Sequence, residues 1–535
     1  MKAKKPSQLY SRAVKKTKNS AKTAVVNTVG TVLPMPDPPD EALRELFDAV
    51  QRQRIYADGK TFVDMRPIGK VKSIMKAYRK QRQKPDFDLA QFIDQNFLAP
   101  QYPAPNYQPT NTTTAREHVT NLWGVLRRSN RRDRGSLISL PYAYITPGGR
   151  FDEQFYWDTY FTMQGLAADG EWGLIYGMVR NYSYMLRKLG MIPTANRTYF
   201  LSRSQPPFFS NMVRLLAEHN GRARTFTEFL PSMLSEYRFW MKGKKEAAKS
   251  VEYSAYLRAV AMPDGTILNR YYDNRSTPRP ESHREDLITA DEANSANKNR
   301  IFLDLRAAAE SGWDFSSRWF ADVDDIRTIE TTNYVAVDLN CLLYQLEKTI
   351  AEAYSVIKQR SLARRFEVAA KRRAAAIRHY CWNSKSNFFE DYKITTGHVS
   401  GRLTLAGVFP LFAGVATNDQ AQAVAERLEK DFLCRGGLVT TLIDNKQQWD
   451  SPNGWAPLQW VAIVGLRNYG YDELAETIRD RWLELNELVF VETQKMLEKY
   501  DVVNIRAGAG GEYPVQDGFG WTNGVYAALK DDQKR

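Results

Sequence analysis

The sequence has few of the residues that build disulfide frameworks and metal sites. It contains three cysteines, Cys341, Cys381 and Cys434, and five scattered histidines among 535 residues. No CxxC, HExxH or HxH grouping occurs, which argues against a disulfide scaffold and a zinc site, and no nucleotide-binding motif is present. We therefore expect no metal and no cofactor. Few, widely spaced cysteines are typical of a reducing compartment, so we expect a cytoplasmic protein.

Long apolar runs are also missing, and so are acidic residues at the start of the chain. No stretch approaches the ~20 apolar residues of a membrane span, so we expect no membrane partner. Residues 1–36 contain eight lysines and arginines and no acid, which leaves about +6 of the formal charge of +14 for the rest of the chain. The basic charge is therefore partly a property of this segment and does not indicate a nucleic-acid groove. We expect a disordered tail over 1–40; a segment directing export or organelle import is the alternative.

What the sequence does contain is apolar residues at helical spacing from about residue 150 onward. One run covers 175–189 and stops at Gly190, as a helix C-cap does, and Asn418 is placed to cap another helix. Strand-like alternation is short, and residues 40–145 look less regular. We expect 41–535 to form a single all-α domain with on the order of twelve helices, a number that fits six helix pairs. The predicted helices cover 175–189, 230–241, 335–357, 362–382, 418–428 and 474–485.

Three segments between these helices have a composition that packing alone does not explain. They are PGGRFDEQFYWDTYF at 147–161, QQWDSPNGWAPLQW at 447–460 and GAGGEYPVQDGFGWTNGV at 508–525. Each combines glycine turns with tryptophan and with acidic, amide or arginine side chains. Aromatic rings stack on the C–H faces of a sugar, and polar side chains bind its hydroxyl groups. Together, the three segments predict a carbohydrate site.

The same segments resemble the trehalases. Further motifs similar to that family are KTFVDMRP at 60–67, RTYFLSRSQPPFF at 197–209, TPRPES at 277–282 and RAAAESGWDFSSRW at 306–319. The resemblance covers about 60–526 in the family's order. It implies an (α/α)6 toroid with long functional loops that acts on α,α-trehalose. We expect a monomer.

The resemblance also implies which residues perform the reaction. Asp314 falls on the family's general acid and Glu512 on its general base, for an inverting hydrolysis that releases one α- and one β-glucose. Gly312 and Trp313 give Asp314 a tightly turned apolar setting that would raise its pKa. The glycines before Glu512 leave room for a water. The implied substrate-binding residues are Arg150, Trp157, Asp158, Arg203, Ser204, Gln205, Arg279, Glu281 and Gly312.

Two positions depart from the family pattern. Phe155 replaces a tyrosine, and Thr194 replaces an asparagine that resembles a sugar contact. Each change removes a polar partner for a substrate hydroxyl, so another α-glucoside, cleaved by the same kind of all-α toroid glycosidase, is the alternative substrate. A basic helical scaffold or nucleic-acid binder is the non-enzymatic alternative, and the modest charge outside the tail argues against it.

Overall fold

The computed structural model describes residues 24–26, 32–34, 36–100, 113–249, 254–293, 295–510 and 518–532. Most of the basic tail lies outside the described residues, and so does Glu512. Within the tail, β1 (Ala24–Val26) pairs with β2 (Val32–Pro34) in antiparallel register. The disorder expected for 1–40 and the single catalytic domain expected for 41–535 stay predictions.

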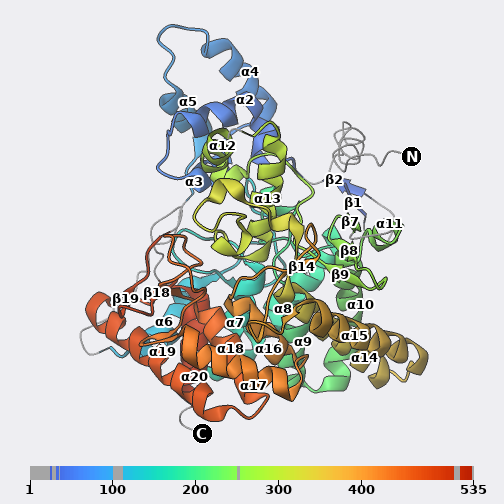
Figure 1. The fold of residues 1–535 in the computed structure, drawn as a ribbon. Helices are drawn as coiled ribbons and strands as arrows, with labels where there is room; N and C mark the ends of the chain where they lie inside the picture. Colours follow the sequence, from blue (N-terminus) through green and yellow to red (C-terminus); the bar gives the residue numbers. More distant parts are fainter. Residues whose placement is uncertain are drawn as a thin grey trace.

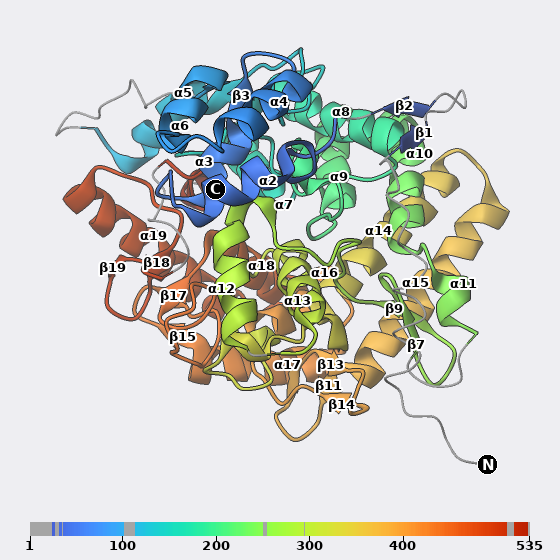
Figure 2. The same cartoon turned by 90° about the horizontal axis from the view of Figure 1, so that it is seen from above.

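Among the described residues, six helices form a closed inner ring (Figures 1 and 2). Each contacts the next in chain order, and the last returns to the first. The inner helices are α7 (Tyr156–Ala168), α9 (Phe209–Asn220), α14 (Val337–Val356), α16 (Phe409–Ala413), α18 (Ala456–Arg467) and α20 (Gly520–Asp532). Sequence periodicity could not show this closure.

The ring closes where α20 packs on α7, and two glycines make this contact tight. A Cβ on Gly165 would lie 2.7 Å from the Cα of Gly524, and a Cβ on Gly524 would lie 2.2 Å from the carbonyl oxygen of Phe161. Any larger residue at these positions would force the two helices apart. The closure therefore depends on glycine in both helices.

Outside the inner ring lie α6 (Ala115–Leu126), α8 (Trp172–Leu189), α10 (Arg222–Trp240), α15 (Arg360–Tyr380), α17 (Asn418–Arg427) and α19 (Asp472–Thr493). Inner α7 buries almost every side chain, whereas outer α15 buries one face and exposes Arg360, Arg364 and Lys371 on the other. A helix that is apolar all round belongs inside, and an amphipathic helix belongs outside. Within the described chain the arrangement is the predicted all-α (α/α)6 toroid.

The helix ends follow the sequence closely. Gly190 ends α8 in the left-handed conformation with φ of 76°, as predicted. The cap of α17 was predicted one residue too late: the Thr417 side chain accepts a bond from the Gln420 N–H, and the Gln420 side chain accepts one from the Thr417 N–H. Asn418 is the first helical residue. This reciprocal capping box satisfies two backbone donors, which a cap at Asn418 would not achieve.

The region at 40–145, predicted to be less regular, is helical. It holds α2 (Pro39–Arg52), α3 (Gly59–Asp64), α4 (Val71–Gln81) and α5 (Leu89–Asn96) as well as α6. The helices α2 to α5 enclose a small core of their own around Leu46, Val63 and Ile93, and form the blue lobe at the top of Figure 1. Helices of one to four turns show too few periodic positions for sequence recognition.

Shorter elements complete the described chain. The remaining α-helices are α11 (Lys244–Ala247), α12 (His283–Glu292) and α13 (Lys298–Ser311). The remaining strands, of two or three residues each, are β3 (Arg66–Pro67), β4 (Phe97–Leu98), β5 (Arg127–Arg128), β6 (Tyr144–Ile145), β7 (Ser254–Tyr256), β8 (Ala259–Ala261), β9 (Ile267–Asn269), β10 (Tyr334–Val335), β11 (Trp382–Asn383), β12 (Phe388–Phe389), β13 (Tyr392–Lys393), β14 (His398–Val399), β15 (Leu433–Cys434), β16 (Gly437–Leu438), β17 (Asn453–Gly454), β18 (Tyr500–Asp501) and β19 (Arg506–Ala507). Over the described residues, no helix combines the length and apolar character needed to span a membrane.

Candidate active site

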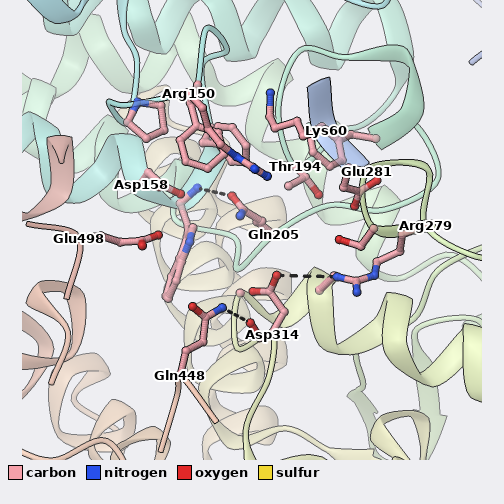
Figure 3. Close-up of a pocket in the computed structure, with 18 of the residues that line it drawn as sticks. Lys60, Arg150, Asp158, Thr194, Gln205, Arg279, Glu281, Asp314, Gln448 and Glu498 are labelled. Atoms are coloured by element: carbon pink, nitrogen blue, oxygen red, sulfur yellow. Dashed lines mark hydrogen bonds and ion pairs between the residues drawn. The ribbon is translucent and has the colours of Figure 1, made fainter. Parts of the chain in front are cut away.

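A cavity lies among the loops that connect the ring helices, next to the lobe formed by α2 to α5. Its lining combines Asp58 and Lys60 from the start of α3 with residues from the three loops singled out in the sequence. Figure 3 shows carboxylates, arginines and amides converging on it from separate segments. Segments far apart in the chain therefore meet at one polar, aromatic site.

Most of the predicted site residues meet in this cavity. Those that line it are Arg150, Trp157, Asp158, Arg203, Gln205, Arg279, Glu281, Gly312 and Asp314. Ser204 does not: its hydroxyl donates to the Ile192 carbonyl at 2.6 Å, and its N–H donates to Glu310 at 2.8 Å. Ser204 therefore supports the loop, while its neighbours Arg203 and Gln205 line the cavity. Glu512 lies outside the described residues.

Buried tryptophans form one wall of the cavity. The rings of Trp449 and Trp455 stack with centroids 3.8 Å apart and planes 3° from parallel, and Trp313 stacks on Trp449 at 5.5 Å. Trp157 and Trp521 pack against the same group. Such a rigid aromatic surface suits the C–H face of a pyranose ring.

Gly312 sets the turn that brings Asp314 to this wall. It ends α13 with φ of 77°, and a Cβ there would lie 2.8 Å from the ring of Trp157. Both the backbone conformation and the space therefore require glycine. The side chain of Asp314 is 39% exposed, so it faces open space, unlike the enclosed apolar setting expected from its neighbours.

Two buried arginines face the carboxylates. Arg279 is held by Asp286 through bonds from Nε and Nη2, and its Nη1 lies 4.0 Å from Oδ2 of Asp314. Arg203 donates through Nη2 to Glu281. Within the described chain, Nε and Nη1 of Arg203 are buried and make no hydrogen bond, and Nη1 lies 3.7 Å from Oδ2 of Asp273 as an ion pair. Buried donors of this kind gain free energy from binding sugar hydroxyls.

Asp158 lies beside the two carboxylates Asp314 and Glu498. Burial, followed by the negative charges of Glu498 and Asp314, raises the pKa of Asp158 to about 8. At neutral pH Asp158 is therefore mostly protonated, and a neutral carboxyl group can both donate to and accept from a sugar hydroxyl. The raised pKa expected for Asp314 stays a prediction.

The structure adds residues to the site that sequence reasoning missed. Glu498, which is 2% exposed, lines the cavity, and Figure 3 shows it entering from a different segment than Asp314. Gln448 donates through its amide to the carbonyl of Asp314. Lys60 forms an ion pair with Glu153 at 2.8 Å. Gln448 and Lys60 stand inside motifs already singled out, but Glu498 follows no glycine turn or tryptophan that would draw attention to it.

Comparison with known proteins identifies the family of the chain. The Trehalase family model matches residues 54–531. The chain belongs to the trehalase family. It is 45% identical over 499 residues to the periplasmic trehalase of Salmonella agona (strain SL483), a match that covers 93% of this chain and 87% of that protein, and equally similar to a putative periplasmic trehalase of Salmonella typhi.

Solved structures of two other glycoside hydrolases are similar to this fold. The neutral trehalase Nth1 from Saccharomyces cerevisiae is 28% identical, with 73% of each chain covered and a TM-score of 0.59. A GH63 mannosylglycerate hydrolase from Thermus thermophilus is 17% identical and covers 78% of this chain and 99% of its own, with a TM-score of 0.53; this likeness shows the fold alone. The predictions of a toroid and of a glycoside hydrolase that cleaves trehalose are confirmed.

The predicted cytoplasmic location is wrong. The two Salmonella relatives are named as periplasmic trehalases, which points to export. The argument rested on few cysteines, but Cys341 and Cys381 are fully buried in the structure. A thiol shielded from solvent is protected from oxidants in either compartment, so the cysteine count does not report the location.

The two departures from the family pattern both lie in the cavity wall. Thr194 turns its hydroxyl to the Ser204 carbonyl at 2.9 Å, so that proton is already donated within the protein. Phe155 packs edge-on against Phe151 and Phe200, with centroids 5.1 and 5.8 Å away. At these two positions the wall is less polar than the family pattern, while the arginines and carboxylates remain.

Proposed function

We propose that the cavity cleaves α,α-trehalose by a single inverting displacement, with Asp314 as general acid and Glu498 as general base. Inversion needs one carboxyl group that protonates the leaving oxygen and a second that activates water on the opposite face of the sugar. The observation that carries the proposal is that Asp314 and Glu498, from separate segments, line the same tryptophan-walled cavity.

The environments of the two carboxylates suit different roles. Asp314 is partly exposed toward the space that a leaving group would occupy. Glu498 is enclosed, as a base that holds a single water would be, and a buried lysine, Lys499, follows it in the chain. Glu512, the base implied by the family resemblance, lies outside the described residues and stays the alternative base.

The sugar-binding residues complete the proposal. The tryptophans that line the cavity provide an aromatic wall for the sugar, and Arg203, Arg279 and protonated Asp158 provide donors for hydroxyl groups. We also propose a monomer as the active unit, because the described lining of the cavity already includes both proposed catalytic carboxylates and the sugar-binding side chains around them. Size-exclusion chromatography with activity measured across the peak tests this; activity confined to a larger species would exclude it.

The reaction course can be tested directly by NMR. We expect the first minutes of a trehalose digest to release α- and β-glucose in equal amounts, because inversion produces β-glucose at the attacked carbon while the leaving glucose stays α. Spectra recorded before mutarotation measure this ratio. Release of α-glucose alone would show retention and would contradict the proposed pair of roles. A panel of other α-glucosides shows whether trehalose is the preferred substrate.

A further inference from the structure

Lys499 is a buried cation beside the proposed base. It is 0% exposed and directly follows Glu498. Its Nζ donates to Oε1 of Gln448 at 2.7 Å and to the carbonyl of Gly510 at 2.9 Å, and it lies 5.2 Å from the ring centroid of Trp455. Burying an ammonium group is costly unless it is paired and hydrogen-bonded, and these two acceptors together with the ring offset part of that cost.

Gln448 connects Lys499 to the backbone of the proposed acid, Asp314, through hydrogen bonds. The Gln448 amide donates through Nε2 to the backbone carbonyl of Asp314, while its Oε1 accepts from Lys499. The backbone carbonyl of Gln448 accepts from Nε1 of Trp455 at 3.0 Å. One glutamine side chain therefore links the residue that follows Glu498 to the backbone of Asp314.

The local β-structure fixes both ends of this link. In the sheet formed by β17, β18 and β19, Gly454 pairs with Tyr500, and Tyr500 pairs with Ala507. The Gly508 N–H donates to the Lys499 carbonyl at 3.2 Å. Lys499 thus stands where three segments join: the tryptophan loop, the segment of Glu498, and the backbone at Gly510.

The charge of Lys499 acts on both proposed catalytic groups. Burial lowers the pKa of Lys499, and the negative charges of Glu498 and Asp314 oppose that shift. The ammonium group therefore lies within electrostatic reach of both carboxyl groups. Among the described residues, the other ionisable groups near the pair include Arg279, 4.0 Å from Asp314, and Asp158, whose pKa both carboxylates raise; Arg150, Arg203 and Glu281 line the same cavity.

We propose that Lys499 is a positioning residue for the hydrolysis: through Gln448 it holds Glu498 and Asp314 in register across the cavity, and it places a buried positive charge beside Glu498. This inference rests on the proposed function. It differs from a purely structural role, because a residue that only anchors the loop would change stability without moving the pH dependence of catalysis.

The test compares Lys499→Met, Lys499→Arg and Gln448→Met on trehalose across pH. For Lys499→Met we expect kcat to fall about 10- to 100-fold and KM to change less than about threefold. The acidic limb of kcat/KM should move to higher pH by about one unit, because the proposed base loses a neighbouring positive charge. Lys499→Arg should keep the wild-type limb, since it keeps the charge. Gln448→Met should lower kcat without moving the limb.

Exposed Lys495, four residues earlier, is the matched control: Lys495→Met should leave kcat and the pH profile unchanged. The inference would be overturned if folded Lys499→Met kept the wild-type acidic limb of its kcat/KM profile. It would also be overturned if the loss of activity came only from a higher KM. If circular dichroism shows that Lys499→Met does not fold, wild-type kcat in Gln448→Met overturns it instead. The wild-type enzyme is assayed first, so that failure of the proposed function and failure of the Lys499 inference can be distinguished. If the wild type released no glucose from trehalose, the proposed function itself would be rejected.

Discussion

Replacing Glu498 by glutamine is expected to lower kcat for trehalose by about 10²- to 10⁴-fold, the usual contribution of a general base. Glutamine keeps the shape of the side chain but cannot take a proton from water. Because the tryptophan wall and the arginines are untouched, KM should change by less than about threefold. Initial rates of glucose release over a range of trehalose concentrations measure both constants.

Glu512→Gln is the matched comparison, because the family resemblance gives that residue the base role. If Glu498 is the base, Glu498→Gln should lose the larger part of kcat of the two variants. Near-normal kcat in Glu498→Gln, together with a severe loss in Glu512→Gln, would transfer the base role to Glu512. Circular dichroism of each variant shows whether a loss reflects chemistry or folding.

Replacing Asp314 by asparagine is expected to lower kcat for trehalose by about 10²- to 10⁴-fold as well, because asparagine cannot protonate the leaving glucose. The same variant should hydrolyse α-glucosyl fluoride at close to the wild-type rate, since fluoride leaves without a proton. Fluoride release monitored with an ion-selective electrode, beside glucose release from trehalose, measures the contrast.

The contrast between the two substrates separates the two roles. Glu498→Gln should be defective on both substrates, because water must be activated in either case. Equal losses of Asp314→Asn on trehalose and on the fluoride would contradict the acid role and leave Asp314 as a group that positions substrate. The comparison thus assigns each carboxylate by its function and not by its place in a motif.

Part of the fold could be predicted because several helices are long. In α8, α14 and α15 the apolar residues recur over four or more turns, so periodicity alone identifies them. The helices α2 to α5 are shorter and interrupted, and they were not recognised. Ring closure depends on contacts between helices far apart in the sequence, and no local pattern encodes such contacts; the family resemblance supplied it.

The residues of the candidate site could likewise be predicted only in part. Arg150, Trp157, Asp158 and Asp314 were named because their motifs resemble those of the trehalases, and the composition of the segment at 147–161 singled out the surroundings of the first three independently. Glu498 was missed because its own segment carries no such mark; pairing of β18 with β17 brings that segment to the tryptophan loop. Ser204 was included because its neighbours belong to the site, and the sequence does not show which way a side chain in a motif points.

The tight contact of α7 with α20 also affects the order in which the protein can fold. It joins the first inner helix, Tyr156–Ala168, to the last, Gly520–Asp532, so the ring is complete only after almost the whole chain is available. Contacts of such long sequence separation slow folding, because the entropy of closing the intervening loop must be lost before the contact forms. A chain that closes its core last cannot complete its toroid before α20 has been synthesised.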